Sequence, residues 1–254
     1  MNAQLGAWIE DLSWPQVAER IATGVNVVVP IGARAKEHGH HLPMKTDYLL
    51  ARALCDGIAA RLPVLVAPVI DFGYYPAFLR YPGSQHLRAE TFIAVLEDIL
   101  DGLIRHGVRD IAIVNTGVST EAPVQIAVRN VLGQHGIRVA VADIRALGKT
   151  QRHLLQQRLG GHGDEHETSL VLAIEPDSVN LAVAVPDYGN MREEPETVFY
   201  RPAVFRNDPA SGPDHSLTGV RGDPTLATIE QGRSTLNAMI EELVDGLVKL
   251  KGRP

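Results

Sequence analysis

Short apolar segments alternate with helix-like segments along this chain, and that alternation limits its fold more than any other feature. Four runs rich in β-branched residues predict buried strands, at residues 26–30, 64–70, 110–115 and 139–144. Helical patterns occupy residues 46–61, 89–106, 123–132, 167–174 and 226–250. Strand–helix–strand repeats give parallel strands joined by right-handed crossovers. We therefore expect an α/β fold, in which a single domain over residues 1–254 forms a three-layer α/β/α sandwich around a mostly parallel sheet.

The charge balance argues against two classes of partner. The net charge is −6, and no run of five basic residues occurs, so neither nucleic acid nor an anionic membrane is an expected partner. No stretch reaches the roughly 18 apolar residues of a membrane-spanning helix, and the first residues lack the pattern of a signal peptide. We expect a cytoplasmic protein that acts on a small molecule. The polar, proline-rich segment 186–222 should be irregular and could serve as a lid or a subunit contact.

The first candidate site follows the first predicted strand. Ligands of parallel α/β sheets bind beyond the carboxyl ends of the strands, and the loop there carries His38, His40 and His41, with Glu37 before them and Asp47 after them. Imidazole together with carboxylate suits Zn, Mn or Fe better than Mg or Ca. The spacing predicts a metal site. The alternative is a polar surface loop in which Asp47 caps the next helix.

A second polar segment precedes the helix predicted at 167–174. It crowds five ionisable residues into seven positions, namely His162, Asp164, Glu165, His166 and Glu167. Acidic residues at a helix N-terminus interact favourably with the helix dipole. On composition alone, the segment is therefore the acid-rich start of a helix.

Both segments resemble the signatures of the creatininase family. Residues 32–47 are similar to the family's Gly-Ser-Thr-Glu-Gln-His-Gly-Pro-His-Leu-Pro-Leu-Gly-Thr-Asp, and residues 162–177 to its His-Ala-Gly-Glu-x-Glu-Thr-Ser-Leu-Met-Leu-Ala-x-x-Pro-Asp. Shorter matches at 81–87 and 222–232 extend the resemblance over nearly the whole chain. It implies a creatininase-like fold and metal-dependent hydrolysis of a small amide or cyclic amide. It also implies one or two divalent ions (Zn, Mn or Fe) per subunit, and a homo-oligomer, which is a hexamer in creatininases.

The resemblance implies a role for each matching residue. His38 and Asp47 match metal ligands, with Asp47 as the bridge between two ions. Glu165 matches a further ligand, and His162 matches a catalytic acid/base. Glu167 is expected to hold the start of the helix.

The family glutamate has no simple counterpart here. It lies two residues before the first histidine, where this chain has Lys36, and the segment is one residue longer than in the family. An inserted residue would bring Glu37 to the ligand position, which is the outcome we expect. The alternative is that Lys36 has replaced a ligand with a charge.

The third strand is followed by a clear departure from the family. The family's Asn-Gly-His loop is Asn-Thr-Gly here, so Gly117 stands where the family has a histidine ligand. Three outcomes stay open: one metal instead of two, a replacement ligand such as His86 or His162, or a degenerate site. We expect Thr116, Gly117 and His86 to bind substrate. The altered loop also leaves two alternatives to amide hydrolysis, namely hydrolysis of a C–C bond in a cyclic keto-inositol, and a metal-poor pseudoenzyme that binds a partner.

Overall fold

The computed structural model describes residues 5–189, 206, 208, 210–211 and 215–251. Its centre is a sheet with the strand order β1-β3-β2-β4-β5, in which all neighbouring strands are parallel. The strands are β1 Ala7–Trp8, β2 Val27–Ile31, β3 Leu65–Val66, β4 Ile111–Asn115 and β5 Ala140–Asp143. The predicted α/β architecture with a parallel sheet is therefore confirmed.

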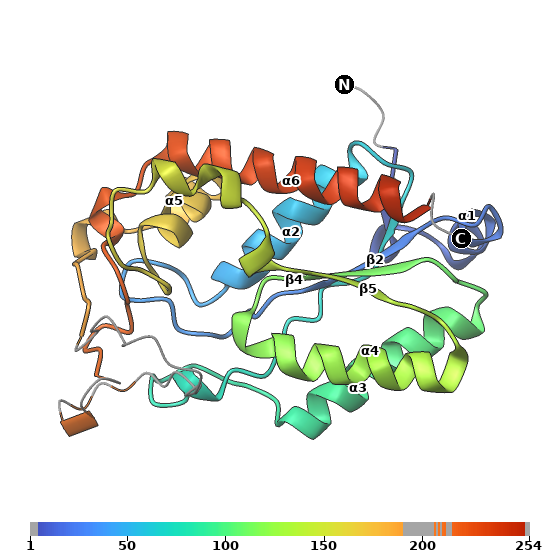
Figure 1. Cartoon of the computed structure of the whole chain (residues 1–254), viewed down its shortest axis with the longest axis horizontal. Helices are drawn as coiled ribbons and strands as arrows, with labels where there is room; N and C mark the ends of the chain where they lie inside the picture. Colours follow the sequence, from blue (N-terminus) through green and yellow to red (C-terminus); the bar gives the residue numbers. More distant parts are fainter. Residues whose placement is uncertain (1–4, 190–205, 207, 209, 212–214, 252–254) are drawn as a thin grey trace.

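Helices cover both faces of this sheet (Figure 1). The longer ones are α1 Trp14–Ala22, α2 Thr46–Ala59, α3 Ala89–Arg105, α4 Glu121–His135, α5 Glu165–Ile174 and α6 Ile229–Lys251. Helices α3 and α4 lie on one face, and α2, α5 and α6 lie on the other. None of the helices in the described part of the chain is both long and apolar enough to cross a lipid bilayer.

The sheet separates two apolar cores because alternate side chains of a strand point to opposite faces. On β2, Val27, Val29 and Ile31 pack toward α3 and α4, while Val28 packs toward α2 and α6. All five residues of β2 are buried, as are all five of β4. A strand that is covered on both faces has a continuous run of apolar residues in its sequence. The sequence therefore predicted β2 and β4 clearly.

Three elements differ from the sequence prediction. The strand predicted at 64–70 pairs only over Leu65–Val66, with one further bridge between Ile31 and Ile70. Pro68 lies between these two pairings, and a proline has no N–H to donate to the ladder. The short strand β1 and the helix α1 were not predicted.

The segment 186–222 lies partly outside the described residues. Its described end lies against the site loops: His162 N donates to Arg221 O at 3.4 Å, and Arg221 N donates to His162 O at 2.7 Å. The Tyr81 hydroxyl donates to Ser216 O at 2.7 Å. The end of this segment therefore helps to build the site.

Candidate active site

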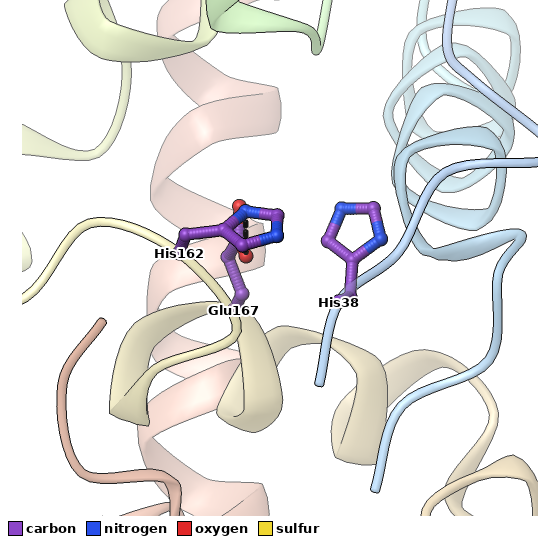
Figure 2. A group of neighbouring side chains, drawn as sticks. All are labelled: His38, His162 and Glu167. Carbon is purple, nitrogen blue, oxygen red and sulfur yellow. Dashed lines mark ion pairs between the residues drawn. The ribbon is translucent and has the colours of Figure 1, made fainter. Parts of the chain in front are cut away.

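The candidate site lies at the carboxyl ends of the central strands. The loop after β2 supplies Lys36, Glu37 and His38, and Asp47 is in the first turn of α2. His162 comes from the loop before α5, which is far away in sequence. Figure 2 shows His162 and His38 next to each other, and their ring centroids are 4.8 Å apart. The fold thus brings together the two segments that the sequence singled out.

His38 is completely buried and fixed through both ring nitrogens. Its Nδ1 lies 2.9 Å from Lys36 O, and since a carbonyl only accepts, Nδ1 carries a proton. Its Nε2 lies 3.0 Å from Asp47 Oδ1. Metal-binding histidines are typically oriented in this way, with one nitrogen tied to a carbonyl and the other directed at the site.

His162 is held between two carboxylates. Its Nε2 lies 2.9 Å from Glu37 O and 3.3 Å from Glu37 Oε2, while its Nδ1 faces Glu167 Oε2 at 3.7 Å. The ring of Phe78 packs on it with a centroid distance of 4.4 Å. Burial favours the neutral ring, but the charge and hydrogen bond of Glu37 and the charge of Glu167 outweigh burial and raise the pKa of His162.

Three side chains form a group that could hold a metal ion. His38, His162 and Glu167 each offer one ligand atom, and these atoms all lie within 4.8 Å of one another (Figure 2). Two imidazoles and a carboxylate suit Zn, Mn or Fe. Each imidazole is already oriented by a main-chain carbonyl on its other nitrogen. The donor set therefore fits one divalent ion.

Glu165 was expected to be a ligand, but its carboxylate has other partners. It is fully buried and accepts hydrogen bonds from Gln156 N, Gln157 N and Gln231 Nε2, at distances between 2.7 and 3.0 Å. Residues two apart on a helix point about 200° apart around its axis, so the start of α5 can direct only one of its two glutamates at His162. That one is Glu167, which the sequence had assigned to the helix start.

Lys36 reaches into the site and pairs with Asp47. Its Nζ lies 2.7 Å from Asp47 Oδ2, with the two side chains only 7% and 4% exposed. Burial opposes ionisation of Asp47, but Lys36 and His38 hold the pKa of this carboxyl well below its usual range. One oxygen of Asp47 thus faces an ammonium and the other an imidazole. The arrangement does not fit Asp47 as a bridge between two metals.

Glu37 supports His162 and lies outside the group of three ligands. Its carboxylate accepts a hydrogen bond from Gly39 N and contacts His162 Nε2, and Ser84 Oγ lies 3.1 Å from its main-chain N. Of the two residues considered for the family glutamate's place, Lys36 reaches Asp47, whereas Glu37 contacts His162 and is not in the ligand group.

The loop after β4 uses its polar groups internally. The Thr116 hydroxyl lies within 3.0 Å of both Ile31 O and Asp47 O. The main-chain N–H of Gly117 donates to Asn115 Oδ1 at 3.1 Å. Neither of these groups is directed at a substrate in this conformation, although Gly117 borders a small pocket.

That pocket lies at the ends of β2 and β4. Its volume is about 10 Å³, which is the room that one water molecule needs, and its lining includes Lys36, Asp47, Gly117 and Tyr75. His86, expected to bind substrate, has its ring centroid 6.0 Å from that of Tyr75. It contacts the pocket lining and does not belong to the group of three ligands.

His41 belongs to the histidine cluster of the sequence but not to the ligand group. It is buried, its Nε2 lies 2.8 Å from Thr168 Oγ1, and burial is the main reason that its pKa is lowered to about 4. In the unfolded chain His41 takes up a proton below about pH 6.5, and in the folded protein it does so only near pH 4. The free energy of unfolding should therefore fall as the pH drops between these two values. The loss at this residue amounts to roughly 3 kcal/mol.

Urea unfolding at pH 7 and pH 4.5 measures this effect, with His41→Gln as the variant that cannot titrate. The variant should lose less stability on acidification than the wild-type chain. Equal losses in both proteins would contradict a neutral, buried His41.

Comparisons with known proteins agree with the fold. The family model described as creatininase, creatinine amidohydrolase, matches residues 10–247. The creatinine amidohydrolase of Pseudomonas putida is 28% identical over 259 residues, covering 94% of this chain and 95% of the relative. The mycofactocin precursor peptide peptidase of Mycobacterium tuberculosis (strain CDC 1551 / Oshkosh) is 26% identical over 245 residues, covering 92% of this chain and 88% of the relative.

Solved creatininases share the architecture over almost their full length. A creatinine amidohydrolase (creatininase) crystal structure has a TM-score of 0.81 and 28% identity, covering 97% of this chain and 98% of that one. Other creatininase structures are described as an Mn form and, for a mutant, as Zn–Zn type, each with a TM-score of 0.80. The family model spans five of the six longer helices and all but the last residues of α6, so this chain belongs to the creatininase family.

Proposed function

We propose that this protein hydrolyses the C–N bond of an amide in a small molecule, with one divalent metal ion held by His38, His162 and Glu167. The observation that carries this proposal is the convergence of these three ligand atoms within 4.8 Å. Two relatives support the amide class, since one is named an amidohydrolase and the other a peptide peptidase. Solved relatives described as Mn and Zn–Zn forms support a metal.

Each residue of the site has a defined part in this proposal. A bound divalent ion supplies an acidified water and polarises the substrate carbonyl. His38 and His162 provide neutral nitrogens, and Glu167 provides negative charge. Glu37 accepts a hydrogen bond from the Nε2–H group of His162. This hydrogen bond directs the other ring nitrogen, Nδ1, toward Glu167. Phe78 covers the His162 ring and excludes water from that side.

His162 was expected to transfer a proton or to replace the missing family histidine as a ligand. We propose the ligand role, because one nitrogen is already satisfied by Glu37 and the other faces Glu167. The test measures bound metal by elemental analysis and hydrolysis of creatinine and of a short peptide amide. The wild-type protein should hold about one ion and hydrolyse at least one of these amides, and His162→Ala should lose both properties.

His40→Ala is the matched control, since His40 is an exposed histidine of the same loop, and it should keep metal and activity. A His162→Ala protein that keeps its metal but loses turnover would overturn the ligand role and assign proton transfer to His162 instead. Wild-type protein that takes up no Zn, Mn or Fe would overturn the metal-dependent proposal. The homo-oligomer expected from the family resemblance stays a prediction, which light scattering checks.

Gly219 keeps Glu37 against His162. Its φ is +85°, and a Cβ at this position would overlap the Glu37 carboxylate. Gly219→Ala should therefore displace Glu37, lower amide hydrolysis at least 10-fold and reduce the free energy of unfolding by about 1–3 kcal/mol. Gly102→Ala in α3, where a Cβ meets nothing within 4 Å, should change neither property adversely. Unchanged hydrolysis by the Gly219 variant would show that Glu37 does not orient His162.

A further inference from the structure

Lys36 places a fixed positive charge inside the site. We propose that its ammonium takes the place of a second metal ion and binds the carbonyl oxygen of the substrate. This inference rests on the proposed amide hydrolysis. It starts from the ion pair with Asp47, in which Lys36 Nζ lies 2.7 Å from Oδ2 and both side chains are almost completely buried.

The charges of the site balance with one metal and not with two. Three carboxylates face it, those of Glu37, Asp47 and Glu167. One divalent ion together with the Lys36 ammonium supplies three positive charges, while His38 and His162 are neutral when they bind metal. Two divalent ions and the ammonium would leave two positive charges unbalanced. Each unbalanced charge in a buried site costs several kcal/mol.

The ammonium also occupies the position that a second ion needs. A second ion on Asp47 would compete with Lys36 for Oδ2. A solved relative described as Zn–Zn type shows that this fold can hold two ions. In the present chain Oδ2 of Asp47 is instead paired with the ammonium of Lys36.

Lys36 connects the metal ligands with the small pocket at the ends of β2 and β4. Its Nζ lies 5.0 Å from the centroid of the Phe78 ring, and the same ring packs on His162. Lys36 also lines the pocket, which has room for about one water molecule and therefore for a single oxygen atom. An amide carbonyl whose oxygen enters this pocket would meet the ammonium while its carbon faces the metal ligands.

This geometry gives Lys36 a task in the reaction. When water adds to the amide carbon, the C=O π electrons move to the oxygen, which becomes an oxyanion. The ammonium stabilises that negative charge through a charge-assisted hydrogen bond. The intermediate then collapses, the C–N bond breaks, and the proton lost by the water ends on the leaving nitrogen. Lys36 keeps its own proton throughout.

The test compares metal stoichiometry with turnover in variants of the full-length protein. Native mass spectrometry during titration with Zn²⁺ counts bound ions, and hydrolysis of the amide that the wild-type protein cleaves gives kcat and KM. The wild-type chain should bind one ion. Lys36→Met keeps an unbranched side chain that is one atom shorter and removes its charge, so it should keep the ion in the ligand group and lose kcat by about 10²–10³-fold.

Lys36→Glu should raise the stoichiometry from one ion to two, because it removes the ammonium and adds a carboxylate beside Asp47. Lys45→Met is the matched control, since Lys45 lies in the same loop but pairs with the partly exposed Glu175. It should bind one ion with unchanged kcat. Circular dichroism checks that each variant folds. If Lys36→Glu does not fold, the loss of kcat in Lys36→Met is the result that tests the proposal.

The outcomes separate this inference from the proposed function. Two ions in the wild-type protein, or full kcat in Lys36→Met, would overturn the role of Lys36. One ion in the wild type and two in Lys36→Glu, without hydrolysis of any amide, would uphold Lys36 as the substitute for a metal and overturn the amide reaction. Metal stoichiometry and turnover are measured independently, so a failure of the Lys36 inference can be distinguished from a failure of the proposed amide hydrolysis.

Discussion

Replacing His38 with alanine should remove the metal ion and lower amide hydrolysis by at least about 10³-fold, since the ligand bond and the orientation of the bound water are lost together. His38 is the residue in this site whose ring nitrogens are most firmly directed, by Lys36 O on one side and Asp47 on the other. Elemental analysis and initial rates measure the two losses. His40→Ala should show neither.

The same substitution should also destabilise the fold, which the sequence did not predict. A histidine on a loop is commonly at least partly exposed, but the exposed fraction of His38 is 0%. Its removal leaves Asp47 Oδ1 without its imidazole partner and opens a cavity beside His162. The free energy of unfolding should fall by about 2–4 kcal/mol. A variant with wild-type stability and full metal content would contradict both parts of this prediction.

Of the substitutions considered, Glu165→Ala should cause one of the largest losses of stability. It should not lower the affinity for metal. The buried carboxylate accepts hydrogen bonds from two consecutive main-chain N–H groups, of Gln156 and Gln157, and from the amide of Gln231 on α6. Its removal leaves these partly buried donors without their acceptor, and each unsatisfied donor that is shielded from water costs about 1–3 kcal/mol. A total of roughly 3–5 kcal/mol corresponds to a melting temperature lowered by about 10 °C or more.

Glu165→Gln separates the charge from the shape of this side chain. The amide keeps one oxygen as an acceptor but turns an N–H₂ group toward a donor, so about half of the loss should remain. Thermal unfolding and bound metal are measured for both variants. Full stability with reduced metal content would restore Glu165 as a ligand, as the family resemblance first implied.

The sequence predicted the layers of the fold better than the details of the site. The strands β2 and β4 are buried on both faces, so their apolar runs stand out, whereas the two-residue strand β1 leaves no periodic pattern. Helix α1 has a signal in its first residues. Ser13 and Gln16 form a capping box, with Pro15 in the first turn.

In the site, the motifs located the right loops but not every side chain. The order of acids before α5 does not reveal which of them faces His162, because that depends on where the helix begins. Asp164 accepts from Glu167 N and sets the first residue of α5 at Glu165. The place of the extra residue between Gly32 and His38 was equally undetermined by spacing, and only contacts in three dimensions show that Lys36 reaches Asp47.

The contribution of the segment around Gly219 was missed because no motif marks it. A signal was present in Gly219 and Gly222, which both adopt the positive φ that favours glycine. A tight turn at these two positions indicates that the chain passes closely over another part of the molecule, here over Glu37.

The wide spacing of the site along the chain has a consequence for its synthesis. His38 and Asp47 emerge from the ribosome early, His162 and Glu167 more than a hundred residues later, and Gly219, which packs on Glu37, later still. Domains acquire their long-range contacts only after the participating segments have been made. A nascent chain therefore exposes His38, one of the three proposed metal ligands, without the other two until His162 and Glu167 have been made. Metal uptake on ribosome-bound chains should begin only once the residues up to Gly222 have left the exit tunnel.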